Sequence, residues 1–469
     1  MPRPTFAPAL LPVVLLGCGP DGEPVTRVLA KPVSAEVAAD AADAGVAARP
    51  VDVRALVPAD EAHGWPTFRG PNRIGTAPQS DPPVEWGEDT NIAWRTNVPG
   101  RGHSSPVVAD GKIFLCSAVP DEAAQLLLCY DAATGERLWE EVVSLGGLPT
   151  KGMHPESTHA SGTPAVAGGA VFVSFLHDGA VRASAYSTEG EKLWGEVELG
   201  DFRPVFGYSA SPVVYGDAVI VGGDNAGPGF LTALDRATGE VMWRTPREAQ
   251  ISFNTPLLAT LDGRDTLVVC GNGAMDAYDP ADGAPLWSVP GLTQTISGSP
   301  AAGPVTVDGR TVDVVVASGG YPGAETLAVA PPAGGEGEPR VLWRNGTKAY
   351  VPSVALHDGL AYLVHDDGRA WCYDAATGEE RWKTRLKAPV FRASPVVVTG
   401  GDPRVYVPSS KGLTTVFAAT GEGYEKLAEN QLGDECYASP AVVGDRLFLR
   451  AATGTGDDRQ DRLYCIASE

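Results

Sequence analysis

Basic residues are scarce in this 469-residue sequence, which has 36 Lys and Arg against 58 Asp and Glu and a formal net charge of −22. A nucleic-acid groove needs Lys and Arg to neutralise phosphates, so we expect no nucleic-acid partner. The motifs of a nucleophile elbow, a P-loop and a dinucleotide-binding loop are also missing. The Gly-rich stretch at 222–230 falls between two predicted strands, not before a helix. The sequence therefore offers no familiar catalytic motif.

Cysteine patterns that signal redox or zinc chemistry are absent, because the seven Cys residues include neither a CxxC nor an adjacent pair. Cys116 and Cys129 fall on consecutive predicted strands and could pair in an oxidising compartment. Three cysteines share one predicted place in a strand, which favours a small packed side chain there: Cys129, Cys372 and Cys465.

Histidine is also scarce, with seven residues. His103, His154, His159 and Glu156 are the candidates for a metal site. His154 and His159 are five residues apart in a predicted loop, however, and such a spacing fixes no ligand geometry. We therefore expect no metal.

Internal repetition is what the sequence has in abundance, and it decides the fold. Clear copies of one motif stand at 131–139 (DAATGERLW), 235–243 (DRATGEVMW), 279–287 (DPADGAPLW) and 374–382 (DAATGEERW); weaker copies stand at 186–194 and 334–343, and a faded copy at 418–426 has Glu425 in the place of the Trp.

A second pattern recurs with the same period as the motif: each repeat begins with a proline, which in most cases follows Ser or Thr. Alternating apolar runs around Asp-Gly or Gly-Asp turns follow each proline and predict paired strands. Four short strands at this period are the unit of a propeller blade. The eight openings are 43 to 58 residues apart: Pro106, Pro164, Pro212, Pro256, Pro300, Pro352, Pro395 and Pro440.

The Asp-x-x-Thr-Gly motif predicts a tight hairpin, because Asp and Thr bond their own backbone and Gly accepts positive φ. The Trp that follows has a large flat surface and an indole N–H that needs a partner. We expect these Trp residues to pack between neighbouring blades and donate to the turn, as structural residues: Trp94, Trp139, Trp194, Trp243, Trp287, Trp343 and Trp382.

The two ends of the chain complement each other. Residues 91–98 look like the fourth strand of a blade, while 439–468 offer three strands and then stop. We predict an all-β fold, an eight-bladed β-propeller of four-stranded blades, in which the N-terminal strand joins the C-terminal blade and closes the ring. Seven blades is the alternative if 392–430 is not a full blade.

The N-terminal region predicts export. Residues 1–18 have a short apolar stretch that ends in Leu15-Leu16-Gly17-Cys18, which resembles a bacterial lipobox with Cys18 as the lipidated residue. An ordinary secretory signal or a plain apolar start are the alternatives. Residues 19–62 have no aromatic residue and predict a disordered tether. The propeller would then occupy 63–469, with a lead-in at 63–90.

The repeats resemble the pyrroloquinoline quinone (PQQ)-type propeller repeat over about 91–469. The lead-in GWPTFRGPNRIG, together with NIAWRTNVPGRGHSSPVV, resembles an exported or lipoprotein bacterial branch of these repeat proteins. In that superfamily, PQQ-dependent alcohol dehydrogenases hold PQQ with calcium on the axis, stacked on a Trp and capped by two adjacent cysteines. The present sequence has no such cysteine pair, and its Trp residues are nearly all blade residues. The other class, the lipoprotein scaffold of outer-membrane protein assembly, is non-catalytic.

This comparison favours a non-catalytic binding or scaffold protein of the cell envelope without a cofactor, which presents a propeller face to an envelope protein or a small ligand. The resemblance and the lipobox imply a monomer held at the outer membrane by lipid alone, facing the periplasm or the surface. A PQQ- and calcium-dependent alcohol or sugar oxidoreductase is one alternative, and a glycan-binding envelope module is another.

The links between blades predict a binding funnel, because residues just before each proline must gather near the axis on one face. Small residues at Gly102, Ser104, Ser161 and Ser297 leave space there. The alternative is that the large side chains only plug the channel. The candidate ligand-binding residues are Arg101, His103, His159, Tyr208, Phe253, Asn254, Tyr350, Phe391, Arg392 and Tyr437.

Overall fold

The structure is a computed structural model that describes residues 64–249, 251–271, 273–292, 295–335 and 337–468, together with two short strands near the N-terminus. Those strands, β1 (Leu16–Cys18) and β2 (Pro24–Thr26), pair in antiparallel fashion within a separate unit, Met1–Arg49. The predicted signal peptide and tether otherwise lie outside the described residues, as does the side chain of Cys18.

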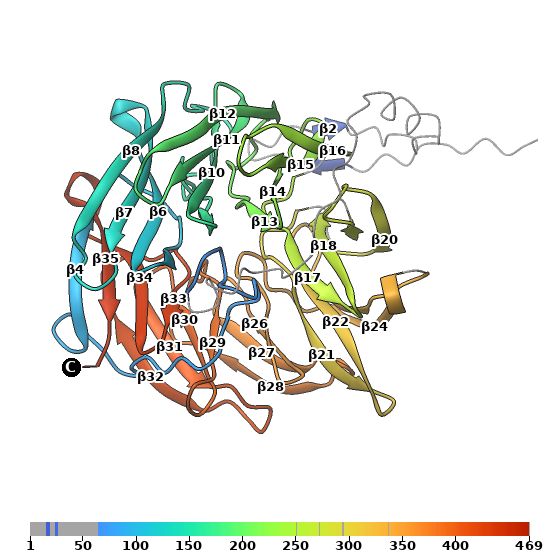
Figure 1. Ribbon diagram of the computed structural model, residues 1–469. Coiled ribbons are helices and arrows are strands. Elements are labelled where there is room, and N and C mark those ends of the chain that lie inside the picture. Colours follow the sequence, from blue (N-terminus) through green and yellow to red (C-terminus); the bar gives the residue numbers. More distant parts are fainter. Residues whose placement is uncertain are drawn as a thin grey trace, which may run out of the picture. The chain divides into compact units, whose positions relative to one another are not determined.

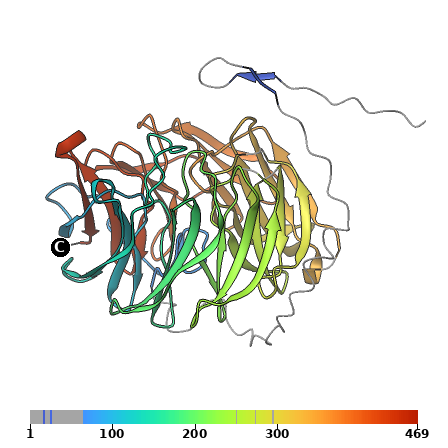
Figure 2. The same cartoon turned by 90° about the horizontal axis from the view of Figure 1, so that it is seen from above.

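Eight sheets form a ring around a central axis, and their first strands lie innermost (Figure 1). Figure 2 shows this ring from the side. The first four blades comprise β5 (Val107–Ala109), β6 (Lys112–Val119), β7 (Ala124–Asp131) and β8 (Arg137–Leu145); β9 (Ala165–Ala167), β10 (Ala170–His177), β11 (Ala180–Ser187) and β12 (Lys192–Asp201); β13 (Val213–Tyr215), β14 (Ala218–Gly222), β15 (Gly229–Asp235) and β16 (Val241–Arg247); and β17 (Leu257–Leu261), β18 (Arg264–Gly271), β19 (Ala274–Tyr278) and β20 (Pro285–Pro290).

The last four blades follow the same meander, and short 3-10 turns at Pro120–Glu122, Ala333–Gly335 and Gly456–Asp458 interrupt the loops. These blades comprise β21 (Ala301–Val307), β22 (Arg310–Gly319), β23 (Glu325–Ala330) and β24 (Arg340–Asn345); β25 (Ala355–His357), β26 (Leu360–Val364), β27 (Arg369–Asp374) and β28 (Glu380–Arg385); β29 (Val396–Val398), β30 (Arg404–Pro408), β31 (Leu413–Ala418) and β32 (Lys426–Gln431); and β33 (Ala441–Val443), β34 (Arg446–Thr453), β35 (Gln460–Ile466) and β4 (Ile92–Val98).

The predicted eight-bladed propeller is confirmed. The faded repeat forms a complete seventh blade, β29 to β32, so the seven-bladed alternative is wrong. The eighth blade takes its outermost strand, β4, from the N-terminal side of the ring, with Trp94 opposite Cys465 in the register. This pairing joins the N-terminal and C-terminal segments of the ring in one sheet and so closes the ring.

The blade Trp residues connect each blade to the next one along the chain. Six of the seven donate their indole N–H to a carbonyl in the hairpin turn of the following blade, at N···O distances of 2.8 to 3.2 Å. Trp194, for example, donates to Arg236 and packs on Gly239, which has a φ of +75°. The Trp therefore bonds the neighbour's turn and not its own.

A small residue stands opposite every blade Trp on the third strand. The partners are Cys465, Cys129, Ala185, Ala233, Ala277, Ala328 and Cys372, in blade order from the ring-closing strand. This explains why the position is cysteine in three blades and alanine in the other four: only a short side chain fits under the indole. Cys116 and Cys129 are both free and buried, so the pairing considered for them does not form.

The lead-in crosses one end of the central channel. Its short strand β3 (Thr76–Ala77) adds to the inner edge of β29 in parallel. Arg69 is fully buried and donates to the carbonyl oxygens of Ile74 at 2.8 Å, of Pro300 at 2.9 Å and of Val354. Burial lowers the pKa of Arg69 to about 9, so the guanidinium is still charged at neutral pH. The lead-in therefore ties several blades together from within the ring.

Candidate functional site

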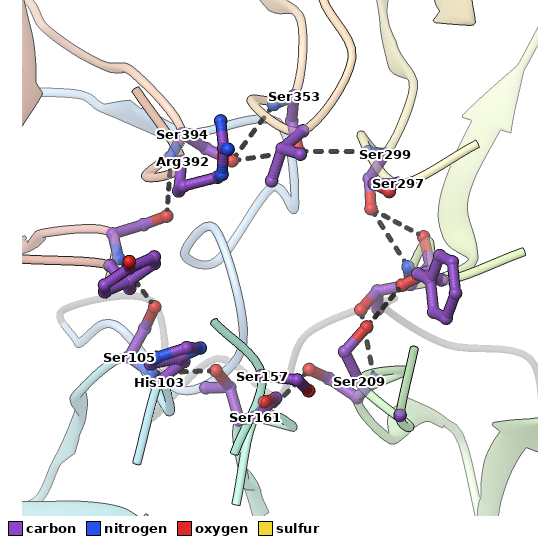
Figure 3. A pocket seen from close by; sticks show the side chains of 18 of the residues that line it. His103, Ser105, Ser157, Ser161, Ser209, Ser297, Ser299, Ser353, Arg392 and Ser394 are labelled. Carbon is purple, nitrogen blue, oxygen red and sulfur yellow. Dashed lines mark hydrogen bonds between the residues drawn. The ribbon is translucent and has the colours of Figure 1, made fainter. Parts of the chain in front are cut away.

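The links between blades surround a cavity of about 360 Å³ on the propeller axis, here called the axial cup. Its side walls come from all eight blades, and Phe68 of the lead-in also lines it. Because the lead-in crosses the channel, the cup is closed by the protein's own chain at one end. Figure 3 shows its polar side chains arranged as a ring.

A belt of eight hydroxyl groups lines the inner end of the cup. The backbone N–H of each member donates to the side-chain oxygen of the member in the next blade, at 2.9 to 3.1 Å, and the last bond returns to the first blade. Every member is buried. This hydroxyl belt consists of Ser105, Thr163, Ser211, Thr255, Ser299, Ser353, Ser394 and Ser439.

The belt explains why Ser or Thr precedes most of these prolines in the sequence. The hydroxyl oxygen at this position accepts the backbone N–H of the preceding blade. In the sixth blade Ser353 fills the belt position, and it follows Pro352 instead of preceding a proline. In this blade the proline comes directly before the belt residue, whereas in the other seven blades it comes directly after it.

A second ring lies two residues before each belt residue, as the alternation of an extended chain requires. Its members line the cup with varied chemistry: His103, Ser161, Ser209, Phe253, Ser297, Val351, Arg392 and Tyr437. The belt is uniform and structural, whereas this upper ring differs from blade to blade. Ligand specificity would have to come from the upper ring.

His103 and Tyr437 form one aromatic wall of the cup. Their rings stack with centroids 4.2 Å apart and an interplanar angle of 13°. Burial is the main cause that lowers the pKa of His103 well below its usual value, and the positive charges of Arg101, Arg450 and Arg459 add to it. His103 is therefore neutral at physiological pH.

Arg392 is the centre of an ion triad at the mouth. Its Nε and Nη2 donate to Oε2 of Glu156 at 3.2 and 3.1 Å, and its Nη1 donates to Oδ2 of Asp366 at 3.0 Å. Glu156 comes from the long link between β8 and β9, so this link reaches across the mouth to the link before β29. Two carboxylates share one guanidinium, which leaves the triad with a net negative charge.

Six of the ten predicted ligand-binding residues line the axial cup: His103, Tyr208, Phe253, Tyr350, Arg392 and Tyr437. The other four do not line it. Arg101 turns to Glu435, at 3.6 Å, and His159 lines a small separate cavity. Asn254 is buried in the link between β16 and β17, where it donates to Ser252 Oγ at 2.5 Å. Phe391 is fully buried in the core.

Several cup residues were not predicted from the sequence. Asp366 and Phe206 come from loops, and Glu156 was considered only as a metal ligand. The belt had a usable signal, namely the Ser or Thr in step with each blade opening. The loop residues had none, since no repeat places them.

Metal ligands do not gather in the described part of the chain: within it, no group of three or more His, Cys, Asp or Glu side chains could hold an ion. Among the helices of those same residues, none has the length and apolar character of a membrane span.

Eight repeat-built blades around a closed axial cup define a PQQ-type β-propeller. A family model described as outer membrane protein assembly factor BamB matches residues 59–175 and 123–384, which is more than half of the chain. The chain belongs to that family.

One relative is an outer membrane protein assembly factor BamB from Burkholderia pseudomallei (strain K96243), 28% identical over 333 residues, which are 67% of this chain and 75% of the relative. Among solved structures, BamB from Moraxella catarrhalis is similar with a TM-score of 0.55 and 17% identity, covering 79% of this chain and 96% of that one.

A quinohemoprotein alcohol dehydrogenase from Comamonas testosteroni is similar in fold, with a TM-score of 0.63, 13% identity, and coverage of 89% of this chain and 82% of that one. At such identities these two structures establish the fold alone.

The cup does not fit PQQ. This cofactor is a planar tricarboxylate that needs cationic partners, and Arg392 is the one Lys or Arg among the described residues lining the cup. Two carboxylates already share that guanidinium. Among the residues that the structure describes, no Trp lines the cup to stack on the quinone, and the sequence lacks the adjacent cysteines that would cap it.

Proposed function

We propose that this protein is a non-catalytic scaffold of the bacterial cell envelope that takes part in outer-membrane protein assembly. The observation that carries the proposal is the family match over residues 59–384, the family being described by that role. The relative from Burkholderia pseudomallei bears the same description.

The face around the cup supports this proposal. Phe206 is 48% exposed at the mouth, and Tyr321 is 62% exposed. Exposed aromatic side chains on loops held by a rigid ring are typical of protein-binding surfaces. The partner we propose is an envelope protein, bound by a monomer of this chain.

The test is deletion of the gene in the source bacterium, followed by measurement of the folded outer-membrane proteins. We expect their amount to fall and the full chain to restore it. A variant with Phe206→Ser and Tyr321→Ser should restore it less well, while Leu138→Ser, at the end of β8 that does not lead into the cup, should restore it fully. Normal levels in the deletion strain would contradict the scaffold role.

Export and lipid anchoring at Cys18 belong to the same proposal, with the outer membrane as the site and the periplasm or the surface as the side. Cys18→Ala should move the protein from the membrane fraction to the soluble fraction. If the variant stays in the membrane fraction, the anchor is elsewhere.

The enzyme alternative has a separate test, because a bound quinone would quench tryptophan fluorescence. We expect no saturable quenching when the full chain is titrated with PQQ and calcium, and no dye-linked alcohol oxidation. Saturable binding with turnover would replace the scaffold by an oxidoreductase.

A further inference from the structure

The charged groups of the axial cup are compensated within the protein. Arg392 is held by Glu156 and Asp366, and His103 is neutral. An anionic ligand would meet a net negative triad in a chain with a net charge of −22. A small cation would have to compete with Arg392 for both carboxylates. The electrostatics of the cup therefore favour an uncharged ligand.

The hydroxyl belt offers hydrogen-bond donors to such a ligand. Each belt oxygen accepts a backbone N–H, so its own proton is free to point elsewhere. Ser299 donates to the carbonyl of Thr255 at 3.0 Å, and Ser394 donates to Ser353 Oγ at 3.0 Å. The other six belt hydroxyls donate to no group among the described residues. An apolar ligand would leave these protons without acceptors, at a cost in free energy.

Further neutral polar groups lie above the belt. His103 Nε2 is buried and has no partner among the described residues. Tyr350 and Tyr437, which each carry a hydroxyl group, also line the cup. Donors and acceptors are thus distributed around the whole wall, as a ligand with hydroxyls on all sides requires.

Aromatic faces complete the site. Phe253 precedes the fourth blade and Tyr437 precedes the eighth, so the two aromatic side chains lie on opposite sides of the eight-bladed propeller. His103 stacks on one face of Tyr437 and fixes the ring, which leaves the other face of Tyr437 for a ligand. Flat rings pack well on the C–H faces of a pyranose, and ordered aromatic side chains lose little entropy in doing so.

We propose that the axial cup binds an uncharged saccharide of one or two rings. The cavity of about 360 Å³ is at the lower end of the range of small-ligand sites, about 300 to 1,000 Å³. The upper ring supplies the stacking faces and the belt supplies the donors. This binding site is distinct from the scaffold role, and its test does not depend on that role.

The experiment is calorimetric titration of the full chain with maltose, cellobiose and N,N′-diacetylchitobiose. Glucuronic acid serves as the charged counterpart. We expect saturable binding of at least one neutral sugar with a Kd of about 1 mM or lower, and weaker binding of the acid. Saturation-transfer NMR should show contacts to the ring C–H protons of the bound sugar.

The variants Tyr437→Leu and Phe253→Leu keep apolar volume but remove the flat ring. Each should weaken sugar binding by about tenfold or more. Tyr437→Phe should retain most of the affinity, and Leu138→Ala, at the end of β8 that does not lead into the cup, should retain all of it. Circular dichroism of every variant establishes that the propeller is intact.

Three results would overturn the proposal. The first is the absence of binding for all three sugars at about 10 mM. The second is equal or tighter binding of glucuronic acid. The third is sugar binding that Tyr437→Leu and Phe253→Leu leave unchanged.

Discussion

Glu156 and Arg392 are 236 residues apart in the sequence, yet one carboxylate oxygen of Glu156 accepts hydrogen bonds from both Nε and Nη2 of Arg392, at 3.2 and 3.1 Å. This contact joins the link between the first two blades to the link between the sixth and seventh. The link between β8 and β9 therefore crosses the mouth of the cup, and the ion pair between Glu156 and Arg392 fixes it there.

The ion pair should control how often this loop opens. A partly exposed pair contributes about 0.2 to 1 kcal/mol, and Glu156 is 42% exposed. We expect Glu156→Gln to speed amide hydrogen exchange in residues 149–158 by up to about fivefold. High salt screens the ion pair in the wild type, so the difference in exchange rate between the wild type and Glu156→Gln should become smaller.

A matched control is Glu189→Gln, which removes the charge of the ion pair with Lys112 on the outer surface. It should leave exchange in 149–158 unchanged. Equal exchange in wild type and Glu156→Gln would mean that the backbone alone holds the loop.

The hydroxyl belt should contribute to stability at the centre of the ring. Ser299→Ala removes the acceptor of the Thr255 N–H and the donor to the Thr255 carbonyl, both at 3.0 Å. Buried groups left unpaired cost about 1 to 3 kcal/mol. We expect a loss of that size in the free energy of unfolding, measured with urea. Ser297 lines the same cup but makes no belt hydrogen bond, so Ser297→Ala should change the free energy of unfolding by less than about 0.5 kcal/mol. Similar values for both variants would refute the belt's role.

The ring was predictable from the sequence because its determinants repeat at fixed spacing. Trp94 and the missing fourth strand of the C-terminal blade, taken together, predicted the closure that β4 and β35 form. The cup was less predictable, since a one-residue shift along a strand moves a side chain to the other face. Phe391 and Arg392 are adjacent, yet one is in the core and the other lines the cup. Asp366 comes from a hairpin turn with no repeat signal.

The turn glycines under the blade Trp residues should be intolerant of any side chain. A Cβ at Gly239 would lie 2.8 Å from the ring of Trp194, and φ there is +75°. We expect Gly239→Ala to cost about 1 to 2 kcal/mol for the backbone and about 1 to 3 kcal/mol more for the clash. Gly169 has a φ of +76° with open space around it, so Gly169→Ala should show the backbone cost alone. Urea unfolding of both variants separates the two terms, and equal losses would show that the indole moves aside freely.

Arg69 should be essential for the lead-in to hold the blades together. Arg69→Met keeps the length of the side chain but leaves the carbonyls of Ile74, Pro300 and Val354 without their donor. Each buried carbonyl left without a donor costs about 1 to 3 kcal/mol. We expect a large fall in the free energy of unfolding and faster proteolysis of residues 64–90. Arg95→Met, at an exposed position on β4, should have little effect on either measurement.

His103 should make stability depend on pH below neutrality. Its pKa in the folded protein is held well below 6.5, chiefly by burial, so the unfolded chain binds a proton there that the folded chain does not. As the pH falls below about 6.5, protonation favours the unfolded state, by up to about 1.4 kcal/mol for each pH unit. The loss continues until the folded-state pKa is reached, and above pH 6.5 it is absent. Other titrating groups are common to both proteins, so the difference between wild type and His103→Gln isolates this contribution. We expect that difference, measured by urea unfolding at pH 7.5, 6.5 and 5.5, to move in favour of His103→Gln as the pH falls; a difference that stays constant would mean that His103 takes up its proton in the folded cup as readily as in the unfolded chain.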